Sequence, residues 1–118
     1  MPERKSSAII EDILTCIEHI QLYTTDLSFE NFSSHFMTIE ACLYNIQVIG
    51  EAVTLLPQEI KKENPDIKWA AIKGMRNRLI HEYFGTDLQL VWNVIQEELP
   101  TLKIKLAILS SELLDQHK

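Results

Sequence analysis

The feature that most constrains the fold is a stripe of apolar residues between Phe36 and Leu56. Apolar side chains recur there at steps of three and four over about six helical turns. The members of this stripe are Ile39, Cys42, Leu43, Ile46, Ile49, Val53 and Leu56. A helix with one long apolar side needs other elements to cover that side. We therefore expect residues 36–56 to form the spine of a helical domain.

The same spacing predicts further helices before and after this one. A first helix is expected over residues 7–23, a third from residues 67–69 to Phe84, a fourth over 87–98 and a fifth over 100–114. The connectors between these helices are short, which favours antiparallel neighbours. The sequence therefore predicts an all-α fold, a four- to five-helix up-and-down bundle.

Local signals mark the ends of the later helices. Gly85 is well placed as the C-cap of the third helix. Thr86 and Gln89 have the spacing of a capping box, which predicts the start of the fourth helix. Pro100 suits the first turn of the fifth.

The connectors and one glycine add detail. Asp26 and Ser28 are natural caps for a short helical turn over residues 29–32, and the charged loop 57–65 has the composition of another brief turn. Gly50 lies inside the second helix, where glycine costs about 1 kcal/mol relative to alanine. We expect another backbone to approach closely at Gly50, in a helix-packing or dimer contact.

Length and composition indicate one domain, residues 1–118, with a core over about 7–114. A chain of 118 residues that is 46% hydrophobic has room for one core. No apolar run approaches the roughly 18 residues that span a bilayer, and the N-terminus lacks a signal-peptide pattern. We expect no membrane association and a cytoplasmic location. Cys16 and Cys42 are expected to be buried thiols without metal or disulfide spacing.

Positive charge is concentrated in one segment of an acidic chain. The net charge is −6, which argues against nonspecific coating of nucleic acid. Six of the eleven basic residues nevertheless lie between positions 61 and 78, against two acids, whereas residues 1–60 carry nine acids and two bases. Such local enrichment suits one anionic ligand or a short stretch of nucleic-acid backbone.

This basic segment runs into the string "GMRNRLIHEYFG", residues 74–85. On one regular helix centred on Ile72, Arg76 lies about 40° and Tyr83 about 20° from the middle of the apolar side. Asn77 and His81 lie on the polar side, about 140° and 180° away. The sequence therefore predicts a semi-buried Arg76, which would need a carboxylate, a phosphate or a subunit boundary.

Two interpretations of this string remain open from the residues alone. In the simpler one, Asn77, Arg78, His81 and Glu82 form a solvated face with a weak surface ion pair, and the polar tip of Arg76 reaches water. In the other, the string is a catalytic site. The choice between them does not follow from periodicity.

The chemistry of a catalytic site can be stated. A neutral imidazole at His81 can take a proton from a hydroxyl at neutral pH, and the guanidinium of Arg76 can grip a phosphate and stabilise its developing charge. Together they suffice for attack of a ribose 2′-hydroxyl on the adjacent phosphorus, and no metal or cofactor is implied. On one regular helix, however, these two side chains point about 140° apart. Two copies related by a two-fold axis could close the site.

An ordered set of motifs resembles one known family. "RNRLIHEY" has the Arg-x4-His-x-Tyr pattern, "IQVIGEAV" precedes it on the second helix, and "NPDIKWAAIKGM" leads into it. The segment "DLQLVWNVIQEELP" follows. Together these motifs resemble the HEPN domains of HepT-like toxins, the partners of MNT nucleotidyltransferases in toxin–antitoxin pairs. The resemblance extends over about residues 7–114.

This resemblance implies a homodimeric HEPN fold and a metal-independent endoribonuclease whose site lies in a cleft between protomers. Carried over by position, Arg76 would hold the scissile phosphate, His81 would act as general base or acid, and Asn77 would orient groups nearby. Tyr83 would be the tyrosine that the cognate MNT antitoxin modifies with AMP, which would block RNA by charge and bulk. Arg78 would be an accessory RNA contact or a surface ion pair.

Other functions stay possible at this point. Glu51, on the second helix, is expected to be a structural partner for a basic residue, without a catalytic role. A non-catalytic helical module that binds a nucleotidyltransferase partner, a nucleotide or both would use the same fold. A purely structural helical dimer is the third possibility.

Overall fold

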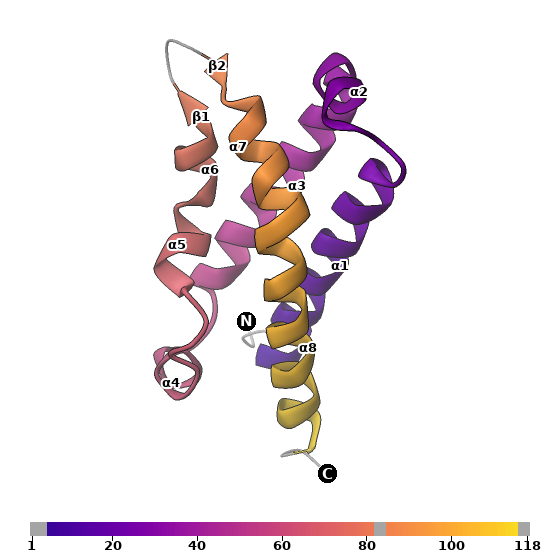
Figure 1. Ribbon diagram of the computed structural model, residues 1–118. Helices are drawn as coiled ribbons and strands as arrows, with labels where there is room; N and C mark the ends of the chain where they lie inside the picture. The colour runs from indigo at the N-terminus through magenta and orange to yellow at the C-terminus, as the bar shows by residue number, and fades with distance from the viewer. Residues whose placement is uncertain (1–4, 82–84, 116–118) are drawn as a thin grey trace.

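The chain runs along its long axis four times, alternately up and down, in a computed structural model that describes residues 5–81 and 85–115 (Figure 1). The four passes are α1 (Ser6–Thr24), then α3 (Phe36–Thr54), then α5 (Trp69–Lys73) with α6 (Met75–Leu79), and last α7 (Leu88–Asn93) with the π-helical turn η1 (Val94–Glu98) and α8 (Leu99–Asp115). The prediction of an all-α up-and-down bundle is confirmed, with four passes of the chain.

Helix α3 is the spine, as its apolar stripe predicted. It packs against α1 on one side and against α5 and α6 on the other, while α8 packs on α1. Its buried side includes Cys42, Ile46 and Ile49, all with no exposed area. None of the helices in the described parts of the chain combines the length and the apolar character needed to cross a membrane.

Two short helices occupy the predicted connectors. In α2 (Phe29–Ser34), the hydroxyl of Ser28 accepts a hydrogen bond from the backbone N–H of Asn31 at 3.1 Å, which is the predicted cap. Phe32 is fully buried, and its ring centroid lies 5.0 Å from that of Trp92. This contact fixes α2 against α7. The second short helix, α4 (Gln58–Glu63), follows α3.

The third helix is shorter than predicted and is broken. Gly74 separates α5 from α6, and α6 ends at Leu79. The chain then enters a two-residue strand, β1 (Ile80–His81), which pairs antiparallel with β2 (Gly85–Thr86). The expected helix end at Phe84 is therefore wrong, although Phe84 itself lies outside the described residues.

The role predicted for Gly85 is wrong as well, and the backbone explains why. Ile80 already has extended dihedrals, φ −113° and ψ 121°, and β-branched residues favour strands. The carbonyl oxygen of Leu79 accepts a hydrogen bond from the N–H of Asp87 at 2.9 Å, which ties the returning strand to the helix end. Gly85 has φ +75°, a left-handed conformation, and lies in β2 rather than at a helix C-cap.

The last two predicted helices are one continuous element. No break separates η1 from α8, and Pro100 is the second residue of α8. A proline ring in a regular α-helix clashes with the carbonyl group four residues earlier, here that of Gln96. The wider π turn over Val94–Glu98 relieves this clash and lets the helix continue. The prediction of a helix boundary at Pro100 is therefore wrong.

The cap of α7 also differs from the prediction. The side chain of Asp87, not that of Thr86, accepts a hydrogen bond from the N–H of Leu90 at 3.1 Å. Gln89 does not complete a capping box, since its amide donates to Asn93 Oδ1 at 3.0 Å. Asp87 is as good an N-cap residue as threonine or better, and the hairpin brings it into position.

Gly50 makes the close backbone contact that was expected of it. A Cβ built on Gly50 would lie 3.1 Å from the carbonyl oxygen of Lys73 and 3.4 Å from that of Ile72. A contact of 3.1 Å is tighter than nine in ten real Cβ contacts. The contact is helix packing within one chain, and it holds α5 against α3.

Candidate active site

The structure places the described site residues on two elements. Arg76, Asn77 and Arg78 lie on α6, and His81 is the second residue of β1, where its backbone faces Gly85. Tyr83, the residue expected to be modified, lies outside the described residues. The motif therefore begins on helix α6 and continues into the hairpin, and it does not lie on a single regular helix.

Arg76 is exposed, so the prediction of a semi-buried arginine is wrong. The break at Gly74 means that α6 has its own apolar side, with its centre between the buried Met75 and Leu79. From that centre Arg76 lies about 80° to one side and Arg78 about 80° to the other. The two arginines thus flank the buried side of α6.

The hairpin also removes a geometric difficulty. The angle of about 140° between Arg76 and His81 assumed one helix through both residues. The backbone leaves the helical course at Ile80, one residue before His81. The helical angle therefore sets no limit on how these two side chains are placed.

Arg76 and Asn77 line a groove of about 290 Å³ between α3 and the α5–α6 pair. Residues of α3 form one wall and residues of α5 and α6 form the other; the lining residues are Gln47, Gly50, Glu51, Thr54, Lys73, Arg76 and Asn77. Among residues 5–81 and 85–115, no hydrogen bond or ion pair engages the Arg76 side chain. The Arg76 side chain is exposed, so no described residue occupies the donors that an anionic ligand would use.

Glu51 does not take the role expected of it. Its Oε1 accepts a hydrogen bond from Nε2 of Gln47 at 3.2 Å, and both side chains are exposed. In the described part of the chain, no basic residue forms an ion pair with Glu51. Sequence reasoning therefore missed that Glu51 lines the same groove as Arg76 without neutralising it.

Arg78 has a protein partner, in contrast to Arg76. Its Nη2 donates to both carboxylate oxygens of Glu98, at 2.9 Å each. The two side chains are 40% and 47% exposed, so the pair is a surface ion pair. The structure favours this interpretation of Arg78 over an RNA contact. Glu98 lies 20 positions away on η1, and helical periodicity gives no signal for it.

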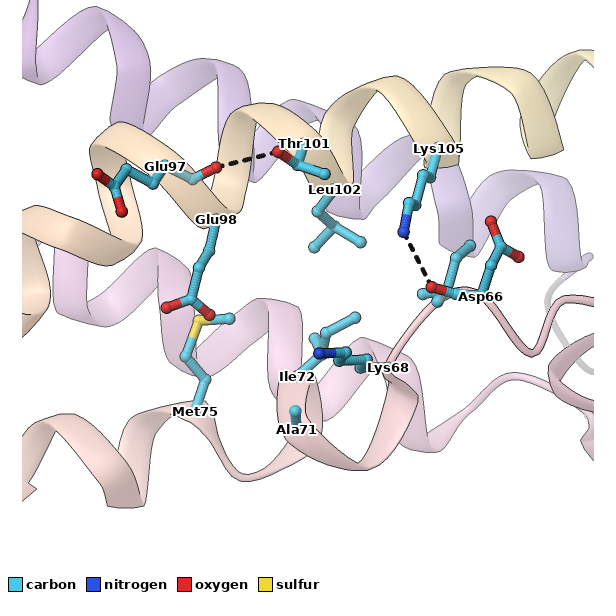
Figure 2. A pocket seen from close by; sticks show the side chains of 11 residues that line it. Asp66, Lys68, Ala71, Ile72, Met75, Glu97, Glu98, Thr101, Leu102 and Lys105 are labelled. Carbon is cyan, nitrogen blue, oxygen red and sulfur yellow. Dashed lines mark hydrogen bonds between the residues drawn. The ribbon is translucent and has the colours of Figure 1, made fainter.

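A second cavity, whose lining side chains are drawn in Figure 2, includes Met75 of α6 in its wall. It measures about 360 Å³ and lies between α5–α6 and η1–α8, with Ile72, Met75 and Leu102 among its apolar lining residues. Lys105 Nζ donates to the backbone oxygen of Asp66 at 2.9 Å beside it. Arg76, Asn77 and Arg78 are not among its lining residues. The candidate site is therefore the smaller groove.

Neither cysteine has the character of a nucleophile. Burial raises the pKa of the Cys42 thiol to about 12. Burial, with a smaller contribution from the Asp12 carboxylate, also raises the pKa of Cys16. Both thiols are therefore protonated near neutral pH, and the chemistry of the groove depends on its nitrogen and oxygen groups.

Comparison with known proteins identifies the family of this chain. A family model described as "Ribonuclease HepT-like" matches residues 13–108. The chain belongs to the HepT-like ribonuclease family. The match includes α3, the groove, α6 and the hairpin, so the HepT-like region contains every residue assigned here to the candidate site.

Individual relatives support membership of the same family. The chain is 36% identical over 103 residues to a protein of Thermococcus cleftensis named "Probable ribonuclease HepT", covering 87% of this chain and 94% of that one. It is 37% identical over 103 residues to "Putative RNase MJ0125" of Methanocaldococcus jannaschii, covering 87% and 89%. "Putative RNase TTE0752" of Caldanaerobacter subterraneus is 36% identical over 94 residues, covering 80% and 84%. No solved structure matches the chain.

Proposed function

We propose that this chain is an endoribonuclease that cuts RNA at the groove beside Arg76 without a metal ion. One observation carries the proposal: the guanidinium of Arg76 is exposed and has no partner among the described residues, whereas Arg78, two positions on, is paired. An arginine that no described residue pairs, lining a polar groove, is suited to a phosphate. Membership of the HepT-like ribonuclease family supports RNA as the source of that phosphate.

The reaction needs only groups of the chain and of the RNA. His81 takes the proton of a ribose 2′-hydroxyl, and the resulting oxygen attacks the adjacent phosphorus. Arg76 stabilises the negative charge that develops on the phosphoryl oxygens, and Asn77 orients the phosphate. The bond to the 5′-oxygen of the next nucleotide breaks, and that oxygen receives a proton. The products are a 2′,3′-cyclic phosphate and a 5′-hydroxyl.

A second copy of the chain completes the site in this proposal. Besides its core side, α3 carries an outward apolar stripe at steps of four, three, four and seven, formed by Met37, Ala41, Tyr44, Val48 and, at the C-cap, Leu55. Met37, Tyr44 and Leu55 are 74%, 68% and 64% exposed. A stripe of this spacing suits a helix of a second copy. It lies beside the groove, so two-fold pairing through it would enclose Arg76.

The proposal extends to regulation. The HepT-like chain would be the toxin of a toxin–antitoxin pair in the cytoplasm, and a cognate MNT nucleotidyltransferase would transfer AMP to Tyr83. Tyr83 follows His81 by two positions in the chain. An added phosphate there would compete with RNA phosphate for Arg76 and block the groove.

Cleavage of a labelled RNA in EDTA tests the catalytic proposal. The wild-type dimer, purified free of any partner, should leave 2′,3′-cyclic phosphate ends. Arg76→Ala and His81→Ala should each reduce the rate by about 10²–10⁴-fold while sedimenting as dimers. Arg78→Ala is the matched control and should cut within a few fold of wild type. If Arg76→Ala and His81→Ala cut as fast as wild type, the site is wrong. A dimer that binds the nucleotidyltransferase but never cuts RNA is the non-catalytic module instead.

Intact mass tests the regulatory part separately. Protein made together with its nucleotidyltransferase should gain the mass of AMP, and the gain should vanish in Tyr83→Phe. A gain that persists in Tyr83→Phe would place the modification elsewhere.

A further inference from the structure

The groove beside Arg76 has one acidic wall and one basic wall. Gln47 and Glu51 are four residues apart on α3 and therefore share a face of that helix. Lys73 and Arg76 line the opposite wall. Because Gly50 lets the backbone of Lys73 come within contact distance, the two walls lie close together. The groove is thus polarised across its width.

Among the described residues, the Glu51 carboxylate accepts one side-chain hydrogen bond. Gln47 is its hydrogen-bond donor, through Nε2 to Oε1 at 3.2 Å. Within residues 5–81 and 85–115, neither Lys73 nor Arg76 approaches it closely enough for an ion pair. A carboxylate has two oxygens and about four acceptor positions. Glu51 therefore keeps most of its capacity to accept hydrogen bonds from a ligand in the groove.

A carboxylate repels phosphate, so Glu51 must face a different part of a bound nucleotide. An ionised carboxylate accepts hydrogen bonds and donates none. Its partners on a nucleotide are the ribose hydroxyls or the donors of a base, and only the donors of the base distinguish one nucleotide from another. Guanine offers two adjacent donors, N1–H and the N2 amino group, that match the two oxygens of one carboxylate. Adenine and cytosine offer one amino group beside an acceptor nitrogen. Uracil offers one N–H between two carbonyl oxygens, which a carboxylate repels.

We propose that the groove is a guanine subsite, in which Glu51 accepts hydrogen bonds from the Watson–Crick edge of a guanine while Arg76 and Lys73 hold the phosphate of the same nucleotide. Gln47 holds the carboxylate in place. The volume of about 290 Å³ is close to the lower end of small-ligand pockets, as one nucleotide requires. This inference rests on the proposed function, because it names the base beside the phosphate that is cut.

Binding to a variant that does not cut separates the two proposals. His81→Ala protein is titrated with guanosine monophosphate and with inosine monophosphate, which differs only by lacking the N2 amino group, and backbone NMR shifts of the groove residues are followed. Guanosine monophosphate should bind about tenfold more tightly, since a bidentate contact distinguishes bases by about that factor or more. Uridine monophosphate should bind more weakly than either.

Adding Glu51→Gln to the same protein should bring the guanosine and inosine affinities to within about twofold of each other, while phosphate-dependent binding remains. Adding Arg76→Ala should instead weaken the binding of all three nucleotides by a similar factor. Equal affinity for the guanine and inosine nucleotides with Glu51 intact would overturn the guanine subsite, as would a preference that survives Glu51→Gln. Neither result bears on cleavage, whereas wild-type protein that binds guanosine monophosphate selectively but cuts no RNA would overturn the proposed function alone.

Discussion

The carbonyl oxygen of Lys73 lies 3.1 Å from the position that a Cβ would occupy on Gly50. This contact sets how closely α5 approaches α3, and therefore how wide the groove is between Glu51 on one wall and Arg76 on the other. A glycine in the interior of α3 weakens that helix. The missing Cβ of Gly50 allows the close approach, and the weaker helix is its cost.

We expect Gly50→Ala to destabilise the protein in spite of the better helix propensity of alanine. The propensity gain is about 1 kcal/mol, whereas overpacking against a backbone atom costs about 1–3 kcal/mol. The net loss should be on the order of 1 kcal/mol in a urea titration. RNA cleavage should fall as well, because the groove walls are pushed apart.

Gly74→Ala is the matched control for this prediction. A Cβ on Gly74 would meet only the Ala70 carbonyl oxygen at 3.5 Å, an ordinary contact, and φ is −89°. It should therefore be neutral or slightly stabilising. If Gly50→Ala is as stable as Gly74→Ala, the close contact does not govern packing of α5 on α3.

The ion pair between Arg78 and Glu98 should contribute little to stability. Both side chains are 40% or more exposed, and solvent-exposed pairs are worth about 0.2–1 kcal/mol. A double-mutant cycle with Arg78→Ala and Glu98→Ala should give a coupling energy in that range, measured by chemical denaturation in low salt. The coupling should shrink at 1 M salt, where charges are screened within about 3 Å. A salt-independent coupling above about 2 kcal/mol would contradict a surface pair.

The two thiols should differ in reactivity with a thiol reagent. With a pKa of about 12, Cys42 is ionised in only about one molecule in 10⁴ at pH 8, and it is fully buried. Cys16 is half-buried and should be labelled first. In native Cys42→Ala protein the labelling rate should match the first phase of wild type. Rapid labelling of both thiols before unfolding would contradict the burial of Cys42.

The raised pKa of Cys42 also predicts a pH effect on stability. The unfolded chain releases this proton near the ordinary thiol value of 9.0, whereas the folded chain keeps it up to about pH 12. The unfolded state therefore binds fewer protons in this window, and the free energy of unfolding falls as pH rises from 9 to 12. Below pH 9 the contribution is fully present. Thermal melts of Cys42→Ala should show a shallower decline over the same window.

Leu79→Ala should slow RNA cleavage by destabilising α6. Leu79 is the last residue of α6 and is fully buried, and such truncations cost about 2–5 kcal/mol. We expect a large loss in thermal denaturation together with slower RNA cleavage, although Leu79 does not line the groove. Ile104→Ala, at a position that is 64% exposed, should change stability by less than about 0.5 kcal/mol.

Periodicity predicted the elements whose structure depends on local pattern. The helices around Ile13 and Ile46 were expected within one or two residues of their observed ends, and the cap at Ser28 was correct. The break at Gly74 and the turn into β1 were not predicted, because the apolar spacing continues through both. The helix boundary predicted at Pro100 was wrong for the opposite reason. Proline is a local helix-breaking signal, but the π turn before it lets the helix continue.

In the candidate site, too, the sequence predicted what depends on local pattern and not what depends on tertiary contacts. The motif identified Arg76 and His81 by residue type and order, but the angles assigned to them depended on a helix that ends at Leu79. The partner of Arg78 is 20 positions away, and the lack of a basic partner for Glu51 among the described residues depends on how α3 and α5 pack. Such relationships are set by tertiary contacts, so local spacing gives no signal for them.

Helix α6 is five residues long, whereas isolated helices shorter than about 12–15 residues are marginal in water. It therefore depends on the burial of Met75 and Leu79 to exist at all. Segments of this kind open locally before a protein unfolds as a whole. In the proposed enzyme, Arg76 would hold the phosphate from this segment, so warming would stop cleavage at temperatures where most of the bundle is still intact.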